Sequence, residues 1–163
     1  MTESSIQDAI HRRLNRKGHR LICPNVGAWG WESDLISVTK SDYTVEYEIK
    51  CDRSDFRRDK DKDRHRYLEQ AHERSDLEHT RFMRRGYGPC RFFYVFDPDM
   101  KFRDLDVPDH AGVMTVSAPN DYGHRYPKEI KKAPRLHGQN MHDDVRRYLE
   151  RGLTWRYWEE RKA

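Results

Sequence analysis

Three residues in the first third of the chain have the types and spacing that phosphodiester hydrolysis needs. Asp34 stands at the start of an apolar run, and a second run ends in Glu48-Ile-Lys50. Two carboxylates can hold a divalent cation that activates water, while a neighbouring lysine can orient or deprotonate that water and can offset charge on the attacked phosphate. Asp34, Glu48 and Lys50 are therefore predicted to form the catalytic centre of a metal-dependent phosphodiesterase.

Two short strands are expected to position these residues. Residues 35–39 and 43–49 are rich in Val, Ile, Thr and Tyr and are short enough to be strands. The polar tripeptide at 40–42 suits the loop of a hairpin. A hairpin centred on Ser41 pairs residues whose numbers sum to 82, twice 41.

This register brings the two acids together. Asp34 faces Glu48, and directly paired side chains have Cβ atoms roughly 4.5–5.5 Å apart. Because side chains alternate along a strand, Glu46, Glu48 and Lys50 point to one face, with Glu48 and Lys50 roughly 6.6 Å apart.

The predicted cofactor is Mg²⁺ or Mn²⁺. Mg²⁺ prefers oxygen ligands, usually one or two carboxylates with water and substrate phosphate. Asp34, Glu48 and the main-chain carbonyl of Ile49 are the predicted ligands, and a second ion would take Glu46 as its additional acid. The alternative is that Glu-x-Lys is an ordinary ion pair on an exposed strand.

The pattern Asp34…Glu48-x-Lys50 resembles that of the PD-(D/E)xK nuclease superfamily, with Ser33-Asp34 in place of the usual Pro-Asp. The resemblance implies an α/β (α+β) fold in which a restriction-endonuclease-like mixed sheet is flanked by helices. It also implies hydrolysis of DNA phosphodiester bonds with divalent metal, in repair, recombination or phage replication. The superfamily includes inactive members, so the alternative function is a catalytically inactive nucleic-acid-binding module with the same fold.

A longer stretch is more specific. Glu48-Ile-Lys-Cys-Asp-Arg-Ser-Asp-Phe-Arg-Arg-Asp-Lys60 is similar to small bacterial DNA-repair-type members, the MmcB-like group. Residues 91–98 and 107–116 also look like that group, and the resemblance covers about residues 5–135. We therefore expect a nuclease-like domain at 1–135 and a C-terminal helical extension at 136–163, packed on the same domain.

Basic and aromatic residues near the acids are candidates for contact with DNA. Asp52 is expected to cap a helix whose N-terminus points back towards the end of the Lys50 strand, and helix N-termini attract phosphate. The predicted backbone contacts are Arg53, Arg57 and Lys60. Trp29 and Trp31, on a glycine-rich loop, are predicted to stack on an exposed base, with packing in the core as the alternative.

Composition agrees with an intracellular enzyme that acts on a polyanion. The chain has 163 residues, a net charge of +4, 37% charged and 35% hydrophobic residues. It lacks an apolar run of about 20 residues and a signal-like N-terminus, and its three cysteines form no CxxC pair. We expect a cytoplasmic protein with reduced cysteines and no membrane association, whose partner is DNA; RNA is not excluded.

Apolar periodicity and turn residues place the other elements. We expect a helix to Lys17, a strand at 20–24, broken helix from 52 to 84, a strand at 91–96, a short helix near 108–111, a strand at 112–117, an extended loop at 118–135, a helix from Asn140 to Arg151 and a last helix capped by Thr154. The crossover from the 43–49 strand to the 91–96 strand should be parallel.

Two further groups of side chains are assigned from helical spacing. His65, His72 and His79 recur every seven residues, roughly 10.5 Å apart along a helix, which is too far for one ion and indicates a solvated face. Trp155 and Trp158 are expected to dock the terminal helix on the body of the protein or on a second copy, which would make a homodimer.

Overall fold

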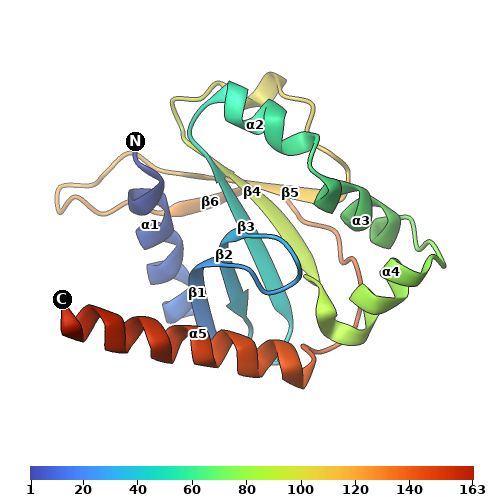
Figure 1. Ribbon diagram of the computed structural model, residues 1–163. Helices are drawn as coiled ribbons and strands as arrows, with labels where there is room; N and C mark the ends of the chain where they lie inside the picture. Colours follow the sequence, from blue (N-terminus) through green and yellow to red (C-terminus); the bar gives the residue numbers. More distant parts are fainter.

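The computed structural model describes residues 1–163, except for the side chain of His79. Its centre is a mixed sheet of six strands that lie side by side in chain order (Figure 1). The strands are β1 (Leu21–Val26), β2 (Ser33–Val38), β3 (Thr44–Lys50), β4 (Arg91–Phe96), β5 (Ala111–Val116) and β6 (Pro127–Lys131). The helices are α1 (Glu3–Arg16), α2 (Arg53–Lys60), α3 (Asp63–His72), α4 (Glu78–Phe82) and α5 (Asp143–Lys162), with a π-helical turn η1 (Met83–Tyr87) and a 3₁₀ turn η2 (Phe102–Asp104). The predicted α/β class is confirmed.

Helices cover both faces of the sheet. On one face the apolar stripe of α1, formed by Ile6, Ile10 and Leu14, packs on side chains from β2 to β5. On the other face two separate apolar clusters lie under α2 and α3 and under α5. Figure 1 shows α2 and α5 across opposite ends of this face. The strip of sheet between these two clusters is where β3 carries its acids and its lysine.

The β2–β3 hairpin has the predicted register. Leu35 pairs with Tyr47, Ile36 with Glu46 and Ser37 with Val45, and each pair sums to 82. The turn includes Asp42 in a left-handed conformation, with a φ of 61°. Continued by one residue, this register sets Asp34 opposite Glu48.

The crossover from β3 to β4 is also as predicted. The two strands are parallel, with Val45 beside Arg91 and Lys50 beside Phe96. The connection is helical and begins at Asp52, whose carboxylate accepts a hydrogen bond from the Asp55 backbone N–H at 2.8 Å. This cap fixes the start of α2 directly after the end of β3.

The sixth strand was not expected. The sequence predicts a loop at 118–135, whereas Pro127–Lys131 forms β6 at the edge of the sheet, antiparallel to β5. Proline at the first position and charged, exposed residues after it are compatible with an edge strand, because one side of such a strand needs no ladder partner. The short helix predicted near 108–111 is also wrong: Ala111 already begins β5, and the short helical turn is η2.

The C-terminal segment is one helix, not two. α5 is continuous through Gly152, and its N-cap is His142 rather than Asn140. Thr154 does not cap a new helix, because its hydroxyl donates to the carbonyl of Glu150 at 2.9 Å, within the same helix. The buried side chains of Val145 and Leu149 pack α5 against β1 and β2. None of the described helices has the length and apolar character needed to cross a membrane.

Candidate active site

The polar strip on β3 brings most of the predicted catalytic residues into direct contact. Glu46, Glu48 and Lys50 alternate along the strand on one face, and all three side chains are buried. Lys50 Nζ lies 2.9 Å from Glu48 Oε1. A buried charge is costly unless it is paired, so the partners of each group determine what the strip can do.

Asp34 is held beside the end of β3 by a backbone contact. Its Oδ2 accepts a hydrogen bond from the N–H of Ile49 at 2.6 Å. Burial, together with the charge of Glu48, raises the pKa of Asp34 to about 7, although the Ile49 N–H opposes this shift. The N–H and C=O of one strand residue point to the same side, so the Ile49 carbonyl also points towards Asp34.

Lys50 is surrounded by acids. Besides Glu48, its Nζ lies 3.2 Å from Asp55 Oδ2 and 3.5 Å from Asp59 Oδ1. Burial alone would lower the pKa of Lys50, but the nearby charges of Glu48 and Asp59 outweigh it and raise the pKa above its usual value. Lys50 is therefore a fixed cation, suited to attract and orient a phosphate rather than to accept a proton.

Arg64, from α3, is a member of the site that sequence reasoning missed. Its guanidinium holds both oxygens of Glu48, with Nη2 at 2.7 Å from Oε1 and Nη1 at 3.0 Å from Oε2. It also contacts Asp59, and its Nη1 lies 3.7 Å from Glu46 Oε1. Its side chain is only 2% exposed. Arg64 and Lys50 thus supply the positive charge that this cluster of carboxylates requires.

Glu46 is the deepest acid of the strip. Its Oε1 accepts hydrogen bonds from Ser33 Oγ at 2.7 Å and from Trp31 Nε1 at 2.9 Å. Its Oε2 is buried and has no hydrogen-bond partner among the described residues. Burial raises the pKa of Glu46 to about 7, against the opposing effect of Arg64. An acceptor atom of this kind is costly to bury, which marks Glu46 as an incompletely satisfied group.

A second polar group extends from Asp59 towards β5. Asp59 Oδ2 accepts from the Tyr94 hydroxyl at 2.8 Å and lies 2.9 Å from His65 Nε2. His65 Nδ1 in turn lies 3.1 Å from His110 Nε2. The predicted solvated face for His65 is therefore wrong: the ring is buried because it completes the partners of Asp59. His79, in the same predicted series, has a side chain outside the described part of the structure.

The residues predicted to touch DNA have diverse surroundings. Arg53 is paired with Asp104 at 3.0 Å, and Lys60 lies 2.9 Å from Asp106 Oδ2, while Arg57 is exposed. These pairs lie at the surface, where ion pairs are weak and can exchange.

The tryptophan loop packs against the site. Trp29 is buried in the cluster under α5, so the packing alternative holds for this ring. Trp31 is only partly buried and lies between Trp29 and Tyr67, with ring centroids 6.4 and 6.3 Å away. Because Trp31 also donates to Glu46, the loop covers the acids from the side of α3.

The types of residue at this site fit a divalent cation. The Asp34 and Glu48 carboxylates and the Ile49 carbonyl are hard oxygen donors at the same end of the β2–β3 hairpin, and burial, together with the charge of Glu48, raises the Asp34 pKa. Among the described residues, however, no group of three acidic, histidine or cysteine side chains is arranged as a ligand set. Arg64 contacts both Glu48 oxygens, and Oε1 also lies beside Lys50, so a cation would compete with these groups for the Glu48 carboxylate.

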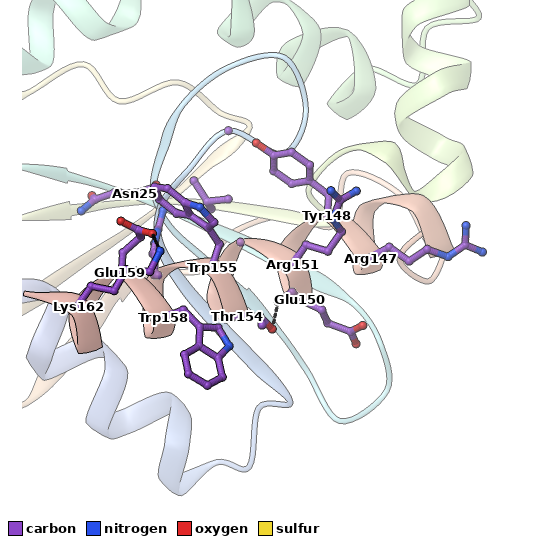
Figure 2. A pocket seen from close by; sticks show the side chains of 14 residues that line it. Asn25, Arg147, Tyr148, Glu150, Arg151, Thr154, Trp155, Trp158, Glu159 and Lys162 are labelled. Atoms are coloured by element: carbon purple, nitrogen blue, oxygen red, sulfur yellow. Dashed lines mark hydrogen bonds and ion pairs between the residues drawn. The ribbon is translucent and has the colours of Figure 1, made fainter.

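A shallow cavity of about 950 Å³ lies elsewhere, between α5 and residues 25–27. Figure 2 shows Tyr148 and Trp155 on one side of α5 and Trp158 on the other. All three rings are at least half exposed, whereas Arg156 donates to the carbonyls of Pro24 and Asn25. The groove contains no acid of the β3 strip, so it is separate from the candidate active site. The predicted docking of Trp155 and Trp158 on a second copy stays a prediction.

Comparison with known proteins bears on the fold. The solved structure described as SPO1766 protein of unknown function from Silicibacter pomeroyi superposes with a TM-score of 0.52 at 17% sequence identity, and the match covers 93% of this chain and 88% of that one. No protein-family model and no curated protein sequence matches the chain. The likeness supports the mixed α/β arrangement alone, because fold does not determine activity.

Proposed function

We propose that this chain is a nuclease that hydrolyses DNA phosphodiester bonds with Mg²⁺ or Mn²⁺, as the resemblance to the PD-(D/E)xK superfamily implies. The observation that carries the proposal is the meeting of Asp34, Glu48 and Lys50 at the ends of adjacent strands. An intracellular, cytoplasmic location and a role in repair, recombination or phage replication belong to the same proposal.

The side chains have separate roles in it. Asp34, Glu48 and the Ile49 carbonyl would hold the cation, which when bound would act as a Lewis acid that activates water and offsets negative charge. Lys50 stays protonated and attracts the phosphate to be cleaved. Glu46 would assist a second ion through its unpartnered Oε2.

Arg64 sets a condition on this reaction. The guanidinium holds both Glu48 oxygens, and a cation and an arginine cannot share the same lone pairs. Because a guanidinium and a metal cation repel each other, a cation bound at Glu48 would favour movement of Arg64 away from at least one Glu48 oxygen. Asp59, which Arg64 also contacts, offers the guanidinium a position to occupy after this exchange.

The second candidate is a nucleic-acid-binding module without turnover. It is favoured by the same arginine: a permanent Arg64–Glu48 pair would stand in for the metal, and Glu48 and Lys50 are each 3% exposed. In that case nucleic acid, DNA or RNA, would bind without metal and would not be cleaved.

A cleavage assay separates the two candidates. Linear, nicked, flapped and branched DNA, with a matched RNA, would be incubated with the protein in EDTA, Mg²⁺ or Mn²⁺. The nuclease proposal expects metal-dependent cleavage that disappears in Glu48→Gln and Lys50→Ala and persists in Arg147→Gln, a control on the exposed side of α5. Cleavage that is equal in all variants would mean a contaminant and would end the assignment. Metal-independent binding without cleavage would establish the second candidate.

A further inference from the structure

Three arginines from distant parts of the chain line one small cavity. Arg74 follows α3, Arg84 lies in η1 and Arg135 lies in the segment between β6 and α5. The cavity has a volume of about 340 Å³, and residues 136–139 form the rest of its lining. The basic residues are thus gathered by tertiary structure and not by a run of sequence.

The charge of this cavity is poorly balanced. None of its described lining residues is acidic. The carboxylate of Asp76 lies 4.0 Å from Arg84 Nη1, but the Asp76 side chain is 87% exposed. Arg84 Nη2 is buried and has no hydrogen-bond partner among the described residues. A buried guanidinium nitrogen without an acceptor is costly, so the described surroundings of Arg84 leave its charge incompletely compensated.

Hydrogen bonds and a ring contact position the wall of the cavity. His137 Nε2 donates to the carbonyl of Gly88 at 2.9 Å, and its Nδ1 accepts from the Gln139 N–H at 3.2 Å, so both ring nitrogens are engaged by the backbone. Arg135 lies over the ring of Tyr43, 4.6 Å from its centroid. Burial, with the charges of Arg135 and Arg84, lowers the pKa of His137, as expected for a neutral ring in a positive field.

The location separates this cavity from the candidate active site. Leu136 donates to the carbonyl of Cys90, and Cys90 donates to that of Thr44, at the first residue of β3. Lys50 is six residues further along the same strand, roughly 20 Å away by strand rise. The cavity is therefore at the opposite end of the sheet from the acids.

We propose that this cavity is a binding site for a phosphate group, held by Arg74, Arg84 and Arg135. Guanidinium groups present several N–H donors in a plane and match the oxygens of phosphate better than other side chains do. The phosphate has two sources, a free ion or nucleotide and the backbone of a nucleic acid. The site does not depend on the proposed nuclease activity.

The test measures binding by titration calorimetry, with inorganic phosphate, pyrophosphate and a ten-nucleotide single-stranded DNA as probes. The decisive variant is Arg74→Gly, because Arg74 has a φ of 58° and glycine adopts that conformation more readily. Arg84→Gln is the second variant, and Arg85→Gln, an exposed neighbour outside the lining, is the control. Removing one arginine should weaken binding about tenfold, as loss of a charge-assisted hydrogen bond does.

Each outcome decides the proposal. Binding of phosphate or pyrophosphate that falls in both cavity variants and is kept in the control supports the site and identifies a small anion as ligand. Binding of the DNA alone, with the same pattern of variants, supports the site and identifies the backbone as the source. If no probe binds the wild type, or if the control loses as much affinity as the cavity variants, the site does not exist. A thermal melt of each variant confirms that it is folded.

Discussion

Replacement of Arg64 by methionine should remove a large part of the stability of this protein. The side chain is 2% exposed and holds both oxygens of Glu48 as well as Asp59, which is fully buried. Removing one partner of a buried ion pair leaves an uncompensated charge and costs about 3–5 kcal/mol. Since domains of this kind have an unfolding free energy of about 5–15 kcal/mol, the variant should remain folded but much less stable.

Urea denaturation at pH 8 in EDTA is the appropriate assay, because Asp34 and Glu46, with pKa values of about 7, are then largely ionised. Arg57→Met on α2 is the control: it makes the same chemical change at an exposed position and should shift the unfolding free energy by less than about 0.5 kcal/mol. The double variant Arg64→Met/Glu48→Gln should have a higher unfolding free energy than Arg64→Met, since it also removes the unpaired negative charge of Glu48.

Divalent metal adds a second measurement on the same proteins. Loss of Arg64 frees Glu48 Oε2 and leaves Oε1 with Lys50 alone among the described residues, so Mn²⁺ should raise the melting temperature of Arg64→Met more than that of the wild type. If Arg64→Met lowers the unfolding free energy by less than about 1 kcal/mol, the electrostatic reasoning is refuted, because the buried carboxylates would then have another counter-charge. An equal response of both proteins to Mn²⁺ would show that Arg64 and the cation do not compete for the Glu48 carboxylate.

Three other changes have defined outcomes. Burial lowers the pKa of His110 to about 3, so the neutral ring stabilises the fold above pH 6.5 and this stabilisation is lost as the pH falls towards 3. His110→Gln should therefore make the urea concentration at the unfolding midpoint less dependent on pH between about 6.5 and 3. Gly86→Ala should destabilise the protein more than Gly30→Ala. Both glycines have a positive φ, but of the two only Gly86 would bring an added Cβ against a backbone atom, the carbonyl oxygen of Asn140. The melting temperatures of the two variants compare these effects. Leu149→Ala should lower the unfolding free energy by about 2–5 kcal/mol, since Leu149 is buried where α5 meets the sheet, and retention of wild-type stability would contradict that packing.

The hairpin was predictable because its register is local. A loop of fixed length and alternating side chains determine which residues of β2 face which residues of β3, and a slip by one residue would turn every side chain to the other face. The meeting of Glu48 with Lys50 follows from strand period alone. These features explain why the β3 acids could be placed without coordinates.

The partners of the acids were not predictable in the same way. Residues 52–66 alternate in charge, which predicts a solvated helix, and Arg64 and His65 lie in that stretch. A weaker signal was present: Arg64 precedes Leu68 and Ala71 at helical spacings of four and seven, on the buried stripe of α3. Placing a charge on that stripe requires knowing that acids of β3 lie beneath it, and this is tertiary information.

The edge strand was missed for a different reason. β6 begins with proline and exposes Lys128, Glu129 and Ile130, so its sequence has neither apolar alternation nor strong strand propensity. It is held by pairing with β5, and such pairing depends on an existing sheet and not on the segment itself.

The composition of the β3 strip is itself an argument for function. Glu46, Glu48 and Lys50 lie between two apolar clusters, where aliphatic residues would join those clusters into one core. Replacing buried ion pairs with well-packed apolar residues is often neutral or stabilising, so stability alone does not account for acids and a lysine at these positions. Arg64 compensates their charge but leaves Glu46 Oε2 unsatisfied and Asp34 with a raised pKa. A divalent cation would supply positive charge of the kind that both deficits require, and for this reason we assign the proposed nuclease chemistry to the β3 strip and not to the wider groove beside α5.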